Sequence, residues 1–343
     1  MQSLSEFHKV HFIAIGGIGM SALARILLNR GLDVRGSDEK ASHITENLVR
    51  QGAKIYIGHR KEQISDADLI VVSSAIKYEN EELEEAKRIG LPIWHRSTLL
   101  KVLMDEKTSI SVTGAHGKTT TSSMLTTLLI HAHMEPSAIL GGELPLIHGN
   151  SCWGNGPYLV AEVDESDGSF LNINTPYAVI TNIEADHLDH YGDLDHIERA
   201  FVQYLNQIPR EGGAFLGIDS PTVTKILPQI TCPYHTFGFS PEAELQARNV
   251  FCYHGGSESE IYWKGERIGI LRLTVPGEYN VQNALAAISV GITLGIPTDL
   301  MLEGLHQFCS SKRRYEKIGS IGDLTFIEDY AHHPTEVRAL LRA

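Results

Sequence analysis

Residues 108–131 read TSISVTGAHGKTTTSSMLTTLLIH and predict a strand, a glycine-rich loop and an apolar helix in immediate succession. A strand that leads through such a loop into a helix is the opening unit of a parallel sheet covered by helices. The common phosphate-binding template G-x-x-x-x-G-K-[ST] would place its first glycine at position 112, where this chain has Val112. Here the loop begins later, at Gly114, so it is a shortened form of the template.

The loop contains the groups that bind a nucleoside triphosphate. Gly114 and Gly117 let the backbone approach phosphate oxygens, and Lys118 supplies a positive charge to the terminal phosphates. A threonine hydroxyl beside the lysine is a suitable Mg²⁺ ligand. The alternative is a glycine turn capped by threonines, but the strand, the lysine and the apolar helix together favour ATP. The expected ATP contacts in the loop are Gly114, Ala115, His116, Gly117, Lys118, Thr119 and Thr120.

Metal ligands are expected at the carboxyl ends of two further strands. Glu162 follows the apolar run PYLVA and His187 follows YAVITNI, and sheets of this kind bind ligands outside the carboxyl ends of their strands. Asp164 and Glu165 compete with Glu162, and the sequence does not choose among the three carboxylates. The alternatives without a metal are a solvated acidic loop and a hydrogen-bonded loop histidine.

A second glycine loop lies near the N-terminus. HFIAIGGIGMSALA spaces Gly17, Gly19 and Ala22 as in the G-x-G-x-x-[GA] fingerprint, between a predicted strand and a predicted helix. Asp38 ends the next predicted strand, near the spacing at which an acid contacts a ribose. The loop and the helix N-terminus can hold a diphosphate, whether of NAD, of FAD or of a UDP-sugar. A purely structural tight turn is the remaining alternative.

Strand and helix patterns alternate from residue 9 to about 105, which predicts a parallel sheet covered by helices. Gly31, Gly52 and Gly90 each follow a helical segment, where a left-handed C-terminal cap is expected. A polar stretch at 104–108 then interrupts the pattern. We therefore expect a first, Rossmann-like α/β domain over residues 1–106.

A central α/β domain of the P-loop type is expected over residues 107–311. Its pattern changes toward a period of two between residues 249 and 277, which predicts a small antiparallel addition. The stretch 310–323 is predicted to be a connector, and 324–343 one strand, a turn and the start of a helix. So short a segment cannot build its own core, so 312–343 is expected to be a linker and the opening of a truncated third, Rossmann-like domain.

The composition limits the classes of partner and location. The chain has 343 residues and a net charge of -13, which argues against nucleic acid and membrane surfaces and favours small ligands. Four cysteines without a C-x-x-C pair indicate neither a cysteine-based zinc site nor a disulfide framework. The sequence has no signal-like N-terminus and no long apolar run, so we expect a cytoplasmic protein. The oligomeric state is left open.

Five further motifs occur in the order DESDGSF, TNIEADHLDHYG, GEYNVQN, KRRYE and DYAHHPTE. Together with the two glycine loops they resemble the Mur ligases over essentially the whole chain, and in that family the shortened loop G-x-x-G-K-T-[ST] is the rule. The resemblance is to the alanine-adding branch. It implies ATP-dependent joining of L-alanine to the lactyl carboxylate of UDP-N-acetylmuramate through an acyl phosphate, with Mg²⁺ as cofactor.

The resemblance also implies roles for individual residues. The catalytic set would be Lys118, Glu162, His187 and Arg314, with Arg313 the less favoured alternative to Arg314. Two Mg²⁺ ions would be bound by Thr119, Glu162 and His187. Besides the loop, ATP would contact Asn280, Asn283, Arg314 and Asp329, although the two asparagines could instead cap a helix. The UDP-sugar would contact Gly16, Gly17, Gly19, Met20, Ser21, Asp38, Ser74 and Arg96. The incoming alanine would face Tyr330, His332 and His333.

The chain departs from the family pattern at three positions. Tyr279 stands where many relatives have histidine, and Glu328 replaces the first aspartate of Asp-Asp-Tyr. Phe201 takes the place of the carbamylated lysine of sister ligases, so we expect no carbamate. Family members also continue beyond the length of this chain. We therefore expect a truncated chain that binds the UDP-sugar but ligates weakly or not at all.

Three rival functions are consistent with parts of the sequence. A recycling ligase would attach a whole tripeptide to the same sugar. An NAD-dependent oxidoreductase would use the first glycine loop for a dinucleotide and carry the second loop in an extra domain. A nucleotide sensor would bind both nucleotides without turnover.

Overall fold

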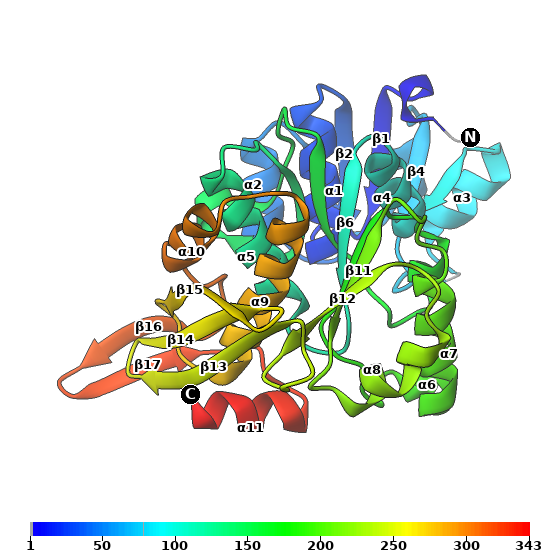
Figure 1. Ribbon diagram of the computed structural model, residues 1–343. Coiled ribbons are helices and arrows are strands. Elements are labelled where there is room, and N and C mark those ends of the chain that lie inside the picture. The colour runs from blue at the N-terminus through cyan, green and yellow to red at the C-terminus, as the bar shows by residue number, and fades with distance from the viewer. Residues whose placement is uncertain (1–2, 78) are drawn as a thin grey trace. The chain divides into compact units, whose positions relative to one another are not determined.

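The structure is a computed structural model that describes residues 3–77 and 79–343. The chain forms two compact units, one of Met1–Lys107 with Asn150–Trp153 and one of Thr108–Gly149 with Gly154–Ala343. Both units are α/β with parallel sheets, as the sequence predicts (Figure 1). The N-terminal unit thus includes a short later segment, Asn150–Trp153, which contains most of strand β8 (Gly149–Cys152). The sequence pattern gives no signal of this return.

The N-terminal unit contains a parallel sheet of strand order β3-β2-β1-β4-β5. From β1 the chain adds β2 and β3 on one side, and it then adds β4 and β5 on the other side of β1. The loop after β1 therefore lies at the topological switch point of the sheet, where such folds bind nucleotides. The strands are β1 (Lys9–Ile13), β2 (Asp33–Asp38), β3 (Lys54–Ile57), β4 (Leu69–Val72) and β5 (Ile93–His95). The helices are η1 (Leu4–Glu6), α1 (Ile18–Asn29), α2 (His43–Arg50), η2 (Lys61–Ile64), α3 (Glu81–Ile89) and α4 (Arg96–Asp105).

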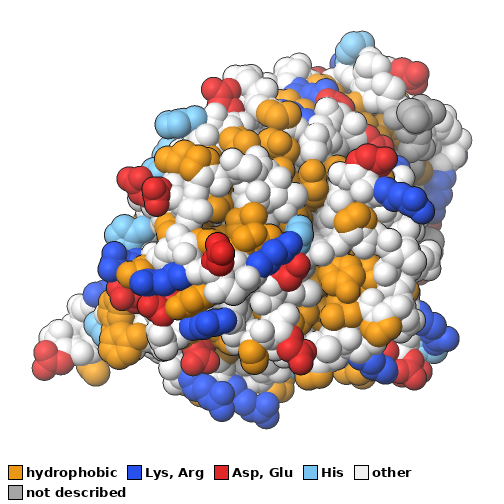
Figure 2. Space-filling view, viewed as in Figure 1, with side chains coloured by type: hydrophobic (Ala, Val, Ile, Leu, Met, Phe, Trp, Pro, Cys, Tyr) orange, Lys and Arg blue, Asp and Glu red, His pale blue; other side chains and the backbone are white. Residues whose placement is uncertain are grey.

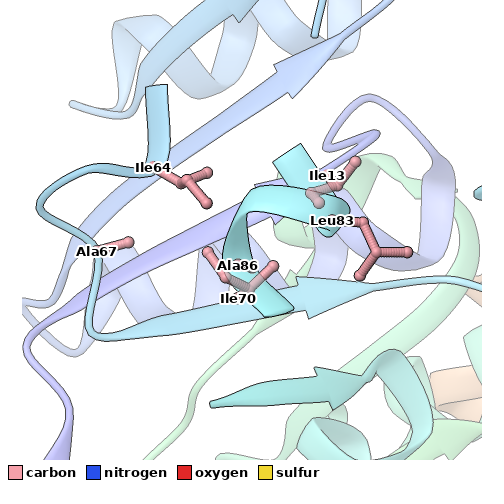
Figure 3. Packing of buried hydrophobic residues seen from close by; sticks show 6 residues of the cluster. All are labelled: Ile13, Ile64, Ala67, Ile70, Leu83 and Ala86. Atoms are coloured by element: carbon pink, nitrogen blue, oxygen red, sulfur yellow. The ribbon is translucent and has the colours of Figure 1, made fainter. Parts of the chain in front are cut away.

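One side of this sheet is closed by α3 and the turn before β4. Leu83 and Ala86 lie about one helical turn apart, so both face the same way from α3. They pack in a buried apolar cluster with Ile13 of β1 and Ile70 of β4 (Figure 3). This packing fixes the helix over the two central strands and so supports the loop that follows β1.

The three glycines expected at helix ends adopt the predicted conformation. Gly31, Gly52 and Gly90 have φ angles of 83°, 104° and 75°. A side chain would be strained in this left-handed region, which explains glycine at each position.

The second unit is built on a larger sheet with the neighbour order β15-β14-β13-β12-β11-β10-β6-β9-β7. Its central strand β6 pairs in parallel with β10 on one side and β9 on the other. The pairs β13–β14 and β14–β15 at one end of the sheet are antiparallel, which confirms the predicted addition. The strands are β6 (Thr108–Thr113), β7 (Ser137–Leu144), β9 (Tyr158–Glu162), β10 (Tyr177–Ile180), β11 (Gly213–Gly217), β12 (Tyr234–Gly238), β13 (Leu245–Tyr253), β14 (Gly256–Trp263) and β15 (Glu266–Leu273).

Helices cover both faces of this sheet, with α5, α9 and α10 on one side and α6, α7 and α8 on the other (Figure 1). The hydroxyl of Tyr204 on α7 donates to Ser111 Oγ of β6 at 2.7 Å. The helices are α5 (Lys118–His131), η3 (Pro145–Ile147), η4 (Ser169–Asn172), α6 (Leu188–Tyr191), α7 (Leu194–Leu205), α8 (Pro221–Ile226), η5 (Leu227–Gln229), α9 (Glu278–Thr293) and α10 (Thr298–His306). Among the described residues, none of the helices combines the length and the apolar character needed to cross a bilayer.

The predicted connector at 310–323 is partly wrong. Glu316–Ile321 forms strand β16, which pairs antiparallel with β17 (Leu324–Glu328) ahead of α11 (Pro334–Arg342). The register shifts between Lys317 and Gly319, which breaks the alternation that marks a strand in sequence. Apolar side chains also stay at the surface of this hairpin (Figure 2), so no single buried face sets a period. The exposed ones are Ile318, Ile321, Leu324 and Phe326.

Candidate active site

The phosphate-type loop lies between β6 and α5 and is held in shape by its neighbours. Gly114 and Gly117 have φ angles of 127° and 80°, which favour glycine. A Cβ atom at Gly114 would collide with Thr181, and one at Gly117 would lie 2.5 Å from Asn283 Oδ1. The backbone N–H of His116 donates to Asn182 Oδ1 at 2.9 Å. The loop is therefore fixed by close backbone approach, with no room for larger residues.

Lys118 turns its ammonium group back into this loop. Its Nζ donates to the carbonyl oxygens of Gly114 at 2.6 Å and Ala115 at 3.3 Å, and to Glu165 Oε1 at 2.9 Å. Burial by itself would lower the pKa of Lys118, but Glu165 and the neighbouring carboxylates outweigh it and raise the pKa. The lysine is therefore charged and is paired with a carboxylate.

The structure separates the three carboxylates that the sequence could not distinguish. Glu162 ends β9, accepts the Gly141 backbone N–H at 2.9 Å and accepts the hydroxyl of Thr119 at 3.2 Å. Glu165 instead contacts Lys118, and Asp164 accepts a backbone N–H within its own loop. Of the three, Glu162 is the carboxylate beside the threonine of the loop.

The pair of Glu162 and Thr119 fits a divalent cation. Carboxylate and hydroxyl oxygens are the ligands that Mg²⁺ prefers. Burial raises the pKa of Glu162 more strongly than Lys118 lowers it, so a positive charge that binds here would relieve an unfavourable buried anion. Sequence reasoning missed Gly141. A Cβ atom at this position would collide with the Glu162 carboxylate, so the contact requires glycine.

His187 lies beyond the end of β10, next to β6 in the sheet, and so at the same edge as Glu162. Its backbone is left-handed, with φ of 53°. Its Nε2 lies 3.8 Å from Glu165 Oε1 and 3.7 Å from Asp186 Oδ2. The structure thus places His187 beside Glu165, while Glu162 lies beside Thr119.

A cavity of about 570 Å³ opens beside the loop. It is large enough for a nucleotide-sized ligand. The predicted ATP contacts that line it are His116, Gly117, Thr120, Asn280, Asn283, Arg314 and Asp329. Sequence reasoning missed other lining residues that follow β10 and β11 at their carboxyl ends, namely Thr181, Asn182, Glu184, Asp219 and Ser220. Their signal is their place after a buried strand, the same signal that indicated Glu162.

The two asparagines of α9 hold the cavity wall together. Asn280 Nδ2 donates to the Pro276 carbonyl at 2.7 Å, and Asn283 Oδ1 accepts the Thr121 hydroxyl at 3.1 Å. The N-cap of α9 is Gly277 and has no side-chain cap. Asn283 thereby joins α9 to α5 immediately behind the loop.

The arginine pair before β16 divides between two environments. Arg314 lines the cavity, whereas Arg313 is exposed and donates from Nε to Glu328 Oε1 at 3.1 Å. The guanidinium group of Arg314 lies 5.4 Å from the ring centre of Tyr330, and that of Arg313 lies 4.7 Å from it. Asp329 accepts the backbone N–H groups of Tyr315 and Ala331, each at 2.7 Å, and so joins the segments before β16 and after β17.

The three departures from the family pattern have defined surroundings. Tyr279 lines the cavity with a largely buried ring, and burial raises the pKa of its hydroxyl. Glu328 pairs with Arg313. Phe201 is 1% exposed and packs on Phe170 with ring centres 5.3 Å apart.

The first glycine loop is closed by Asp38. Asp38 Oδ2 accepts the backbone N–H of Gly16 at 2.8 Å, and a Cβ atom at Gly16 would lie 2.8 Å from the same oxygen. The first intrahelical bond of α1 runs from the Ser21 N–H to the Gly17 carbonyl. The N–H groups of the preceding first turn, from Ile18 to Met20, therefore point out of the helix start and suit an anion.

Other predicted contacts of this loop lie in different positions. Arg96 brings Nη1 to 3.4 Å from the place of a Cβ on Gly19, and Ser74 is exposed after β4. Met20 and Ser21, by contrast, are buried, and the Ser21 hydroxyl donates to the Ile18 carbonyl at 2.9 Å. Asn150 Nδ2 donates to that carbonyl at 2.7 Å, a contact that sequence reasoning missed because Asn150 is remote in the chain.

Comparisons with known proteins agree with this architecture. Residues 9–108 match the model described as Mur ligase family, catalytic domain, and residues 112–291 match the model described as Mur ligase middle domain. The chain is 43% identical over 341 residues to the UDP-N-acetylmuramate–L-alanine ligase of Pelobacter propionicus, covering 98% of this chain and 74% of the relative. It is 42% identical over 335 residues to the ligase of the same name from Aquifex aeolicus, with the same coverage of 98% and 74%.

Solved structures resemble the chain over most of its length. The UDP-N-acetylmuramate-alanine ligase of Thermotoga maritima has a TM-score of 0.89 at 32% identity, covering 97% of this chain and 76% of that one. The UDP-N-acetylmuramate:L-alanyl-γ-D-glutamyl-meso-diaminopimelate ligase of Neisseria meningitidis has a TM-score of 0.82 at 26% identity, covering 90% of this chain and all of that one. On the two matched domains and the identity of these relatives, the chain belongs to the Mur ligase family.

Proposed function

We propose that this ligase joins L-alanine to the lactyl carboxylate of UDP-N-acetylmuramate at the expense of ATP. The observation that carries the proposal is the loop of β6 with charged Lys118 and the Thr119–Glu162 pair, at the edge of a nucleotide-sized cavity. The relatives described above carry this activity in their names. A cytoplasmic location is part of the proposal.

ATP would bind in the cavity, with its phosphates on the loop. Lys118 and Arg314 would neutralise negative charge on the transferring phosphoryl group. We assign Thr119 and Glu162 to one Mg²⁺ and His187 to a second. Bound Mg²⁺ would supply Lewis-acid stabilisation of that charge.

The reaction follows from the chemistry of the three substrates. The lactyl carboxylate attacks the γ-phosphorus, ADP leaves, and an acyl phosphate forms. The amine of alanine then attacks the acyl carbon, the tetrahedral intermediate collapses, and phosphate leaves as the amide is made. The acyl phosphate is sensitive to hydrolysis, so the residues around the site must also exclude water.

The UDP-sugar would bind through its diphosphate to the first turn of α1. We propose that Asp38 acts by holding Gly16 in the loop, and that Arg96 near Gly19 adds positive charge. Met20 and Ser21 would contribute through their backbone, since their side chains are buried.

Two rival functions are less well supported. The recycling ligase is represented by a structure at 26% identity, against 43% for an alanine ligase. An NAD-dependent oxidoreductase has no support from the family that the chain matches.

The proposal is tested by phosphate release from ATP in the presence of UDP-N-acetylmuramate, measured on a chain of the relatives' full length, because the present chain is expected to ligate weakly or not at all. We expect release to require L-alanine, to be weaker with serine or glycine, and to be absent with the tripeptide. Lys118→Ala should abolish release, because it removes the charge that faces the phosphates. Release with the tripeptide but not with alanine would favour the recycling ligase, and a fluorescence response to NADH without phosphate release would favour the oxidoreductase.

A further inference from the structure

A compact group of metal-type ligands lies beside the phosphate loop, and none of its members has a metal-binding role in the proposed reaction. It consists of His116 from the loop, Glu184 from the segment after β10 and His333 from the position before α11. His116 Nε2 lies 3.3 Å from Glu184 Oε2, and His333 Nδ1 lies 3.7 Å from the same oxygen. One ligand atom from each of the three residues falls within 4.8 Å of the other two.

Neighbouring side chains support this group as a second layer of contacts. Glu336 Oε1 lies 3.4 Å from His116 Nδ1, so Nε2 of the same ring faces Glu184. Glu336 Oε2 also accepts the backbone N–H groups of His332 at 3.2 Å and His333 at 3.5 Å. Thr335 donates its hydroxyl to Glu184 Oε2 at 3.0 Å. A carboxylate behind a histidine is the usual arrangement for fixing a metal-binding imidazole.

We propose that His116, Glu184 and His333 form a binding site for a borderline divalent cation of the Zn²⁺ class. Two imidazoles and one carboxylate, with a fourth position open to water, are a common zinc ligand set, whereas Mg²⁺ prefers oxygen ligands. Ligands on a tetrahedral zinc ion at the usual bond lengths lie about 3.3 Å apart. Two of the three separations are already close to this value, so the ion can bind with small side-chain shifts.

This site is distinct from the proposed Mg²⁺ ligands, because it shares no residue with Thr119, Glu162 or His187. Within the described part of the chain, it is also the only set of three such ligand atoms at this spacing. His116, Glu184 and Glu336 line the nucleotide cavity. A bound ion would therefore link the loop to the start of α11 at the cavity wall.

The experiment is a Co²⁺ titration of the metal-free chain without nucleotide or sugar, followed by visible absorption. We expect one four-coordinate Co²⁺ per chain, displaced by Zn²⁺ but not by excess Mg²⁺. His333→Ala and Glu184→Gln should each remove the absorption, and Glu336→Gln should weaken binding about 10–100-fold. His196→Ala is the matched control, because exposed His196 lies 2.6 Å from Asp193 without a third ligand, and it should bind as the parent does.

Circular dichroism establishes whether each variant folds. If His333→Ala does not fold, Glu184→Gln provides the same test of the site. The proposal is overturned if the folded variants bind Co²⁺ as tightly as the parent. It is also overturned if His196→Ala removes the signal, or if Mg²⁺ displaces Co²⁺ at similar concentration. No step of the test uses ligase activity, so failure of the proposed function would not affect the result.

Discussion

The carboxylate of Glu162 shows how one residue joins the fold to the proposed chemistry. It ends β9, accepts hydrogen bonds from Gly141 and Thr119, and has a raised pKa because it is buried. Glu162→Gln keeps the size and a hydrogen-bond acceptor but removes the charge. We expect phosphate release to fall at least about 100-fold, because a charge that acts in the transition state is lost. Thermal stability should stay equal or rise slightly, because the buried anion is unfavourable.

Phosphate release and thermal unfolding of the same preparation check this prediction. Glu198→Gln is the control, since Glu198 is also buried but pairs with Lys225 on α8 and should leave turnover unchanged. Parent-like turnover of Glu162→Gln would mean that Asp164 or Glu165 is the metal ligand instead.

Gly117 allows a second prediction about a single residue. Gly117→Ala combines a strained φ of 80° with a Cβ only 2.5 Å from Asn283 Oδ1. Gly295→Ala has a similar φ of 74° but open space around the new methyl group. We expect about 1–2 kcal/mol of destabilisation in the Gly295 variant from the backbone alone, and more in the Gly117 variant.

Chemical unfolding with and without an ATP analogue separates the two effects. The Gly295 variant should bind the analogue as the parent does, and the Gly117 variant should not. Equal destabilisation and equal binding in both variants would show that the loop yields easily and is not tightly packed against α9.

Sequence reasoning named many residues of the candidate site but not their contacts. Spacing alone indicated Gly114 and Lys118, because a loop that binds phosphate needs glycine and lysine at fixed offsets. It could not assign Glu162 and Glu165 to different partners, because both follow the same strand and only side-chain direction distinguishes them. It also could not show that Asp38 holds Gly16, since this bond depends on how two strand ends meet.

Helix α3 illustrates how a helix is held to a sheet by hydrogen bonds to one buried carboxylate, that of Glu82. Glu82 accepts or shares hydrogen bonds with His11 of β1 and His59, each at 3.0 Å, and with Ser37 of β2. Burial by itself would raise the pKa of Glu82, but these partners outweigh it and lower the pKa. A carboxyl group with a lower pKa in the folded state stabilises the fold fully above its ordinary value of 4.5. That contribution is lost as the pH falls through the lower, folded-state value.

We therefore expect the free energy of unfolding to decline on the acid side, and Glu82→Gln to lose most of this dependence. Urea unfolding between about pH 3 and pH 7 measures it. Glu84→Gln is the matched control, because Glu84 is exposed on the same helix and should keep the parent profile. A uniform loss of stability in Glu82→Gln at every pH would mean that packing, and not charge, attaches α3.

Most elements were predictable because each carries a local pattern tied to burial. The strands β9 and β10 are largely buried and read as apolar runs, and Gly31, Gly52 and Gly90 mark helix ends. Strand β16 was not predictable, because its residues are largely exposed and its register shifts. Its partner β17 is equally exposed, but its run LTFIE still indicates a strand.

The division into two units predicts two separate patterns of ligand protection. An ATP analogue should slow amide hydrogen exchange in β6, α5 and α9, while UDP-N-acetylmuramate should slow it in β1, α1 and the strand end at Asp38. Because Asn150–Trp153 belong to the N-terminal unit, they should respond to the sugar nucleotide. Hydrogen exchange read by mass spectrometry checks this. Protection of 150–153 by the ATP analogue alone would contradict the assignment of the segment.

The excursion of four residues into the N-terminal unit has a consequence for how such proteins can be recombined. The polypeptide passes between the units three times, after Lys107, after Gly149 and after Trp153. A chimaera with a single crossover after Lys107 would combine the glycine loop of another protein with Asn150 of this chain. The side-chain amide of Asn150 donates a hydrogen bond to the Ile18 carbonyl at the start of α1. To graft a new sugar-nucleotide specificity, residues 150–153 would therefore have to be exchanged together with residues 1–107.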